Sequence, residues 1–161
     1  MFNADEILQI AVTIEENAQS FYSKASERVS DEEAKKIFAE LAAWEVGHIA
    51  IFSKMRARFA EAGAGVAFDD PDGEAASYLQ AIADGKIFDT RKVETELSSL
   101  PDSPLEIIQM AIAREKDAVL FYLSLQDMVP ETLGRDEVKA IVSEEVSHVR
   151  FLSEKATQFK S

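Results

Sequence analysis

The sequence predicts an all-α protein: a four-helix bundle made of two helical hairpins that are copies of each other. Only 6 Gly and 4 Pro occur in 161 residues, and the prolines leave 1–70 and 105–129 free of them. Apolar residues recur at steps of three and four in four long segments, as on the buried face of a helix. The second half of the chain also repeats the first. Two hairpins joined by one long crossover are therefore expected.

The first hairpin is expected over residues 3–62. Asn3 can cap the first helix, and Glu6 stands at the position that completes a capping box. Ser30 offers a cap for the second helix, with Glu33 at the matching position. Because the join between the helices is very short, we expect them to pack antiparallel.

Residues 63–102 have a different composition. They hold four of the six glycines and two of the four prolines. Residues 78–82 are predicted to form one or two helical turns. The segment has too few apolar residues for a core of its own. We therefore interpret it as a crossover inside one domain that spans residues 1–161.

The second hairpin is expected over residues 103–159. Ser103 can cap its first helix, with Pro104 at the favoured first position. Pro130 and Gly134 mark the turn before the fourth helix.

Charge and composition exclude several classes of protein. With 30 acidic and 17 basic residues, the net charge is −13, which disfavours binding to nucleic acid or to anionic membranes. No apolar run approaches the ~18 residues of a membrane span, and the acidic N-terminus does not resemble a secretory signal. The chain has no Cys, which excludes disulfides, zinc ribbons, iron–sulfur clusters and thiol catalysis. We expect a soluble, cytoplasmic protein.

The repeat becomes visible when the chain is shifted by 100 residues. Twelve of 47 positions are then identical between residues 7–53 and 107–153 without a gap. Two hairpins that fill one core could share apolar positions by patterning alone. Patterning does not explain matching Glu, His and Tyr, so these matches indicate function.

Both histidines of the chain lie in a Glu-x-x-His motif, which places the two side chains on one face of a helix. Another Glu stands 30 residues before the Glu of each motif, and a Tyr follows that first Glu seven residues later. The residues of the repeated pattern are Glu15, Tyr22, Glu45, His48, Glu115, Tyr122, Glu145 and His148.

The glutamates of this pattern lie among apolar residues, where an ionised carboxylate is costly unless it is paired or bound to a metal. Four inward carboxylates would repel one another, and two divalent cations would balance their charge. Carboxylates with a little imidazole suit iron or manganese, and zinc can substitute. The pattern therefore predicts a dinuclear metal site.

The combination of motifs carries a family resemblance. Glu-x-x-Ala-x-x-Phe-Tyr at 15–22 and 115–122, with Glu-x-x-His at 45–48 and 145–148, resembles the ferritin-like superfamily and, within it, the rubrerythrin family. The resemblance covers both hairpins and leaves the crossover unmatched. It implies two iron ions, with manganese or zinc as substitutes, held by Glu15, Glu45, His48, Glu115, Glu145 and His148. It also implies that Glu45 and Glu145 bridge the ions and that Tyr22 and Tyr122 orient carboxylates.

The resemblance implies a di-iron protein oxidised by hydrogen peroxide or dioxygen, a peroxidase-like or ferroxidase-like oxidoreductase in oxidative-stress defence. It also implies a homodimer. Two features depart from the family. The four-Cys rubredoxin domain is missing, so electrons would come from a separate donor such as a rubredoxin or a flavoprotein. Ala118 replaces a further Glu that takes part in redox-linked iron movement, which argues against efficient peroxide reduction.

Other interpretations stay open at this point. The bundle can instead store or handle iron without reductive turnover, or be a metal-stabilised, non-enzymatic protein. The six polar residues can be a solvated acidic face with two incidental histidines. The two tyrosines fit the core as well as they fit the site. We expect Phe21, Phe121 and Trp44 in the core and Glu144 on the surface rather than as an extra ligand.

Overall fold

The computed structural model describes residues 3–63, 68–86 and 90–160, and it describes side chains outside residues 82–93. Within these ranges the chain is helical and contains no strand. The helices are α1 (Ala4–Arg28), α2 (Glu32–Ala62), α3 (Glu74–Lys86), α4 (Thr90–Ser98), α5 (Pro104–Met128), a 3-10 turn (Glu131–Leu133) and α6 (Arg135–Gln158). None of the described helices is long and apolar enough to cross a membrane.

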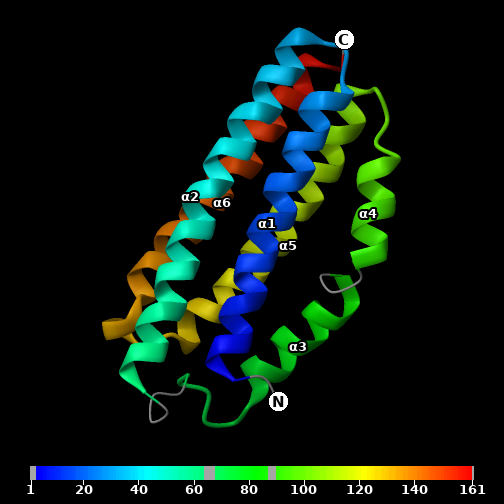
Figure 1. Cartoon of the computed structure of the whole chain (residues 1–161). Helices are drawn as coiled ribbons and strands as arrows, with labels where there is room; N and C mark the ends of the chain where they lie inside the picture. The colour runs from blue at the N-terminus through cyan, green and yellow to red at the C-terminus, as the bar shows by residue number, and fades with distance from the viewer. Residues whose placement is uncertain (1–2, 64–67, 87–89, 161) are drawn as a thin grey trace.

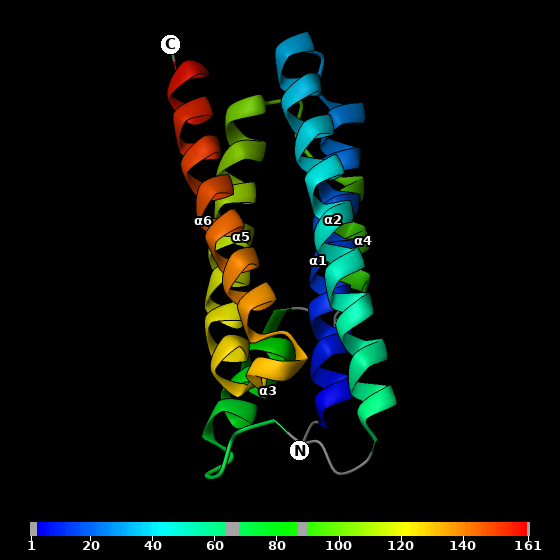
Figure 2. The ribbon, with the colours of Figure 1, turned by 90° about the vertical axis from the view of Figure 1, so that its left-hand side faces the viewer.

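Four long helices form the bundle, and each hairpin packs as a unit. α1 packs along α2 and α5 packs along α6, and the two pairs lie side by side (Figures 1 and 2). Helices that match in the repeat run in opposite directions, α1 against α5 and α2 against α6 (Figure 1). The internal two-fold axis is therefore perpendicular to the bundle, and it brings the middles of all four helices to one level.

The predicted caps of the two hairpins are confirmed, with one correction. Asn3 and Glu6 form the capping box of α1, and the side chain of Ser103 accepts a hydrogen bond at the start of α5. The cap of α2 was wrongly predicted at Ser30. Asp31 accepts the hydrogen bond from the Ala34 amide instead. The Ser30 hydroxyl donates to the carboxylate of Asp102 at 2.7 Å.

Residues 78–82, predicted to form helical turns, lie inside α3, but α3 is longer than predicted and α4 was not predicted. Helices α3 and α4 occupy much of this segment and carry the chain along the bundle (Figure 1). α3 packs against α5 and α4 contacts α1. Asp70 accepts hydrogen bonds from the Ala75 and Ala76 amides at the start of α3. A residue that was predicted to be part of a helix break therefore stabilises the first turn of a helix. Residues 64–67 and 87–89 of the predicted crossover lie outside the described residues.

The apolar core is divided into two clusters that lie toward opposite ends of the bundle. One contains Ile7 to Val12 of α1 with Phe121 and Tyr122 of α5. The other contains Phe21 and Tyr22 of α1 with Ile107 and Ile108 of α5. Along α1 and α5, the boundary between the clusters falls at Glu15 and Glu115. The polar residues of the repeat therefore form a buried layer between two apolar ones.

The turn before α6 requires glycine. Gly134 has φ +125°, and a Cβ there would lie 2.8 Å from Met55 Cε. We expect Gly134→Ala to lower the free energy of unfolding by about 1–3 kcal/mol, because an L residue is strained at this φ. Urea denaturation measures the change. Gly47→Ala is the control, since Gly47 is helical, exposed and open around its Cα. Gly47→Ala should stabilise α2 by about 0.5–1 kcal/mol. Equal changes in the free energy of unfolding for the two variants would contradict the explanation that the positive φ of Gly134 requires glycine.

Candidate metal centre

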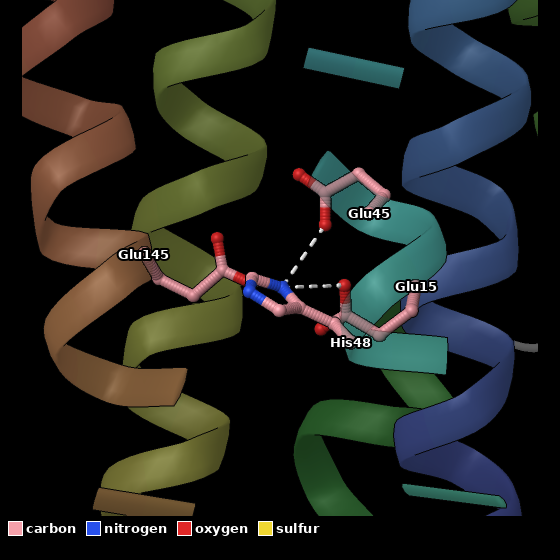
Figure 3. A group of neighbouring side chains, drawn as sticks. All are labelled: Glu15, Glu45, His48 and Glu145. Carbon is pink, nitrogen blue, oxygen red and sulfur yellow. Dashed lines mark hydrogen bonds and ion pairs between the residues drawn. The ribbon is translucent and has the colours of Figure 1, made fainter. Parts of the chain in front are cut away.

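The structure brings the six predicted ligands together at the middle of the bundle. Each of the four long helices contributes a Glu, and α2 and α6 each add a His one turn further along. All six side chains are buried. Three helices converge on His48 in Figure 3: Glu15 from α1, Glu45 from α2 and Glu145 from α6. Since Glu-x-x-His places both side chains on one helical face, each motif delivers its pair to the same side.

Glu45 and Glu145 each lie between the two imidazoles. The two oxygens of Glu145 are both 2.9 Å from an Nδ1 atom, Oε1 from that of His48 and Oε2 from that of His148. Glu45 spans the same two nitrogens, with Oε2 at 3.3 Å and Oε1 at 3.4 Å. Each carboxylate therefore offers one oxygen to each half of the site, which is the geometry that bridging requires.

Glu15 and Glu115 lie at opposite ends of this arrangement. Glu15 Oε2 is 3.3 Å from Nδ1 of His48, and Glu115 Oε1 is 3.8 Å from Nδ1 of His148. Each accepts a short hydrogen bond from a buried tyrosine of the other hairpin: Tyr122 donates to Glu15 and Tyr22 donates to Glu115. The tyrosines thus connect α1 to α5 while they hold the two carboxylates in place.

Protons balance the charge of the site when no metal is bound. Burial alone would lower the pKa of each His. The surrounding carboxylates, close to the ring nitrogens, outweigh it, raising the pKa of His148 to about 12 and that of His48 well above its usual range. Burial raises the pKa of Glu115 to about 8 and that of Glu15 well above its usual range. Near neutral pH two imidazolium ions then face two ionised carboxylates.

Glu45 and Glu145 are the carboxylates that stay ionised. Burial opposes their charge, but the adjacent rings of His148 and His48 outweigh it and lower both pKa values, that of Glu145 strongly. The tyrosines stay protonated, because burial and then the nearby carboxylates raise their pKa values well above the usual range. Both hydroxyls therefore remain hydrogen-bond donors over the whole physiological range.

The chemistry of the donor atoms fits metal ions better than it fits protons. Nδ1 of His48 faces oxygens of three carboxylates, although one N–H can serve only one of them well. Both oxygens of Glu45, one of Glu145 and Nδ1 of His148 are buried without a well-formed hydrogen bond to any described residue. Such groups are costly to bury unless something else coordinates them.

Two sets of converging donor atoms follow from this geometry. One consists of Glu15, Glu45, His48 and Glu145, and the other of Glu45, Glu115, Glu145 and His148. The ligand atoms of each set lie within 4.8 Å of one another. The sets share Glu45 and Glu145, so they describe two adjacent candidate positions for a cation, with the two shared carboxylates between them.

The tyrosine hydrogen bonds lead to a prediction. Removing the hydroxyl with Tyr122→Phe leaves one oxygen of Glu15 buried without its donor. We expect this to cost about 1–3 kcal/mol of stability and to weaken metal binding about 10- to 100-fold. Chemical denaturation and competition with a chelator measure the two effects. Tyr78→Phe, at an exposed position of α3, is the control and should change neither. A Tyr122→Phe protein with unchanged metal affinity would show that the hydroxyl does not position Glu15.

Two residues that the sequence placed outside the site contact it. Trp44 was wrongly predicted in the core: it is 36% exposed, and its ring stacks on that of His148 with centroids 5.1 Å apart. Glu144 is exposed as predicted, yet its Oε2 lies 2.7 Å from Nε2 of His48. Each directly precedes the Glu of a Glu-x-x-His motif, and this adjacency was the only signal for them in the sequence. Phe21 and Phe121 are fully buried, as predicted.

Comparisons with known proteins show the fold and the family of this chain. A comparison with curated protein sequences found no match. A crystal structure described as a ferritin-like diiron-carboxylate protein from Thermotoga maritima is 29% identical, with a TM-score of 0.69. The alignment covers 97% of this chain and 95% of that one. The all-α, ferritin-like bundle predicted from the sequence is thereby confirmed.

The family comparison covers a shorter part of the chain than the structural alignment does. The model for the rubrerythrin family matches residues 6–103, which run from α1 through the crossover to the N-cap of α5. The matched range thus includes the crossover, which the motif resemblance left out, and stops before the second hairpin. It spans more than half of the chain and includes one complete copy of the Glu and Glu-x-x-His pattern. The chain therefore belongs to the rubrerythrin family.

Proposed function

We propose that this protein holds two iron ions at its centre and is oxidised there by hydrogen peroxide or dioxygen, acting as a peroxidase-like or ferroxidase-like oxidoreductase. The observation that carries the proposal is the pair of donor sets that share Glu45 and Glu145. Oxygen-rich donors with one imidazole in each set suit iron or manganese. An iron pair supplies one electron per ion, and together these meet the two-electron demand of peroxide.

The protein residues have distinct parts in this proposal. Glu45 and Glu145, which belong to both donor sets, would hold both ions, and their negative charges would stay close to the ions when the metal charge changes. Glu15 and Glu115 hold the outer side of each position, and the hydroxyls of Tyr122 and Tyr22 keep them aligned. The apolar clusters above and below keep bulk water out of the layer, so the ionic contacts are stronger than in water.

The electrons for repeated turnover come, in this proposal, from a separate protein such as a rubredoxin or a flavoprotein. The described residues contain no further cluster of His, Cys, Asp or Glu with metal-binding geometry besides the two sets, and the chain has no Cys for a rubredoxin-type iron.

The test is anaerobic loading with ferrous ion followed by rapid mixing with hydrogen peroxide, recording the ferric absorbance. Oxidation faster than that of free ferrous ion, at two irons per chain, supports the proposal. Oxidation no faster than that of the free ion contradicts it. Sustained peroxide consumption with a reductant identifies a peroxidase. Iron contents well above two per chain identify storage instead, and a centre that holds only zinc in cells identifies a structural role.

A further inference from the structure

The two halves of the centre differ at one pair of equivalent positions. Residues 44 and 144 correspond in the repeat, and each directly precedes the Glu of its own Glu-x-x-His motif. At position 144 the chain has Glu, whose carboxylate lies 2.7 Å from Nε2 of His48. At position 44 it has Trp, whose ring stacks on His148 at an interplanar angle of 18°. The predicted ligands are duplicated, but these neighbours of the two imidazoles are not.

The geometry assigns each nitrogen of His48 a separate partner. Nδ1 faces the centre, since it lies within 3.3 Å of Glu15 and Glu45 and 2.9 Å of Glu145. Nε2 points outward, where its N–H can donate to Glu144. When a histidine binds a metal through one nitrogen, a carboxylate on the other fixes the tautomer and the ring orientation and strengthens the donor.

Trp44 cannot do the same for His148. Its indole has an N–H donor and no acceptor, so it cannot take a hydrogen bond from an imidazole N–H. It covers the ring by stacking and contacts Phe151 edge-on, with centroids 5.4 Å apart. The His148 set is also the looser one, because Glu115 lies 3.8 Å from its Nδ1 where the equivalent Glu15 distance is 3.3 Å.

We propose that Glu144 is a positioning residue that makes the His48 position the tighter of the two, so that the duplicated centre binds its two ions unequally and in order. The inference rests on the proposed dinuclear centre and adds to it which position fills first. The first ion takes the set of Glu15, Glu45, His48 and Glu145. The second ion then completes the site beside His148, under Trp44.

The experiment is a titration of the full, metal-free chain with Co²⁺, whose visible absorption reports coordination, in competition with a chelator. The unmodified chain is expected to bind two ions in two distinct steps. Glu144→Gln should weaken the tighter step about 10- to 100-fold and leave the weaker step in place. Glu154→Gln on the same helix is the matched control, because it removes the same charge from an exposed position and should change neither step.

A gain-of-function variant tests the same idea from the other side. Trp44→Glu supplies His148 with the carboxylate that His48 already has, and it should tighten the weaker step. Helix content by circular dichroism verifies that each variant is folded. Glu144 is 58% exposed, so its replacement by Gln is not expected to disturb the bundle.

The outcomes separate this inference from the proposed function. No stoichiometric Co²⁺ binding would overturn both. Two ions bound with equal affinity would overturn the inequality and leave the dinuclear centre standing. Two unequal steps that respond to Glu144→Gln no more than to Glu154→Gln would overturn the part assigned to Glu144.

Discussion

Raising the pH from about 6.5 to about 8 is expected to destabilise the metal-free protein and to strengthen metal binding. The buried layer has two ways to balance its charge, with protons or with cations. His48, His148, Glu15 and Glu115 hold protons in the metal-free fold near neutral pH. Two divalent ions would displace them. Because the ions and the protons compete, metal binding tightens as the pH rises.

The direction of the stability change follows from the pKa shifts. His48 and His148 have raised pKa values, so the stability they give the metal-free fold is complete below the unfolded value of about 6.5 and is lost above it. The raised pKa values of Glu15 and Glu115 act in the same direction from about 4.5 upward, for Glu115 as far as about 8. Each proton held only by the folded chain changes the free energy of unfolding by about 1.4 kcal/mol per pH unit. Glu45 and Glu145 act oppositely, and their contribution is lost only as the pH falls below about 4.5.

Thermal unfolding of chelator-treated and Co²⁺-loaded protein across this pH range measures the effect. The gap between the two melting temperatures should widen as the pH rises. Calorimetry in buffers of different ionisation enthalpy should show about four protons released for each pair of ions bound near pH 7. A gap that stays constant would mean that the four groups are not protonated in the metal-free fold.

Replacing Glu145 with Gln is expected to have the largest effect of any single substitution in the centre. Glu145 lies 2.9 Å from Nδ1 of both histidines, so one change weakens both positions. In the metal-free protein near pH 6, the substitution removes the carboxylate that balances two buried imidazolium ions. We expect this to lower the free energy of unfolding by about 3–5 kcal/mol. A similar loss of interaction with the ions corresponds to roughly 100- to 5,000-fold weaker metal binding.

Urea denaturation and Co²⁺ competition measure the two consequences of Glu145→Gln. The stability cost should shrink as the pH rises toward 8, because the loss of Glu145 lowers the pKa values of both imidazoles and lets them release their protons in the variant. Glu40→Gln, at an exposed position of α2, is the control and should stay within about 0.5 kcal/mol of the unmodified chain. A variant that still binds two ions with unchanged affinity would show that Glu145 is not shared between them.

The fold was predictable because its signals are local and repeated. The helical stripes and the Asn3 and Ser103 caps each depend on residues a few positions apart. The convergence of the polar residues was predictable for another reason: two copies of one hairpin in a single bundle bring equivalent residues to one level. That these residues bind a metal remains a prediction.

What the sequence could not supply depends on how separate helices pack. The full length of α3 and the whole of α4 were missed because Asp and Gly residues interrupt the crossover sequence, and Asp70 accepts hydrogen bonds at the start of α3. Trp44 was wrongly predicted to be buried because it is next to Glu45 in the sequence. The buried face of α2 is narrow, so a residue adjacent to a buried one lies at its edge. The contact between Glu144 and His48 joins α6 to α2, and no spacing within one helix predicts the reach of a side chain across to another.

The stacked rings give this protein its own optical reporter. Trp44 is the only tryptophan of the chain, and its ring lies against His148 and not against His48. His148 in turn stacks on His48, with centroids 5.6 Å apart. We expect a paramagnetic ion bound beside His148 to quench the indole emission more strongly than one bound only beside His48, because His148 is the ring in contact with Trp44. The intrinsic fluorescence of the unlabelled protein is therefore expected to report binding beside His148 more strongly than binding beside His48.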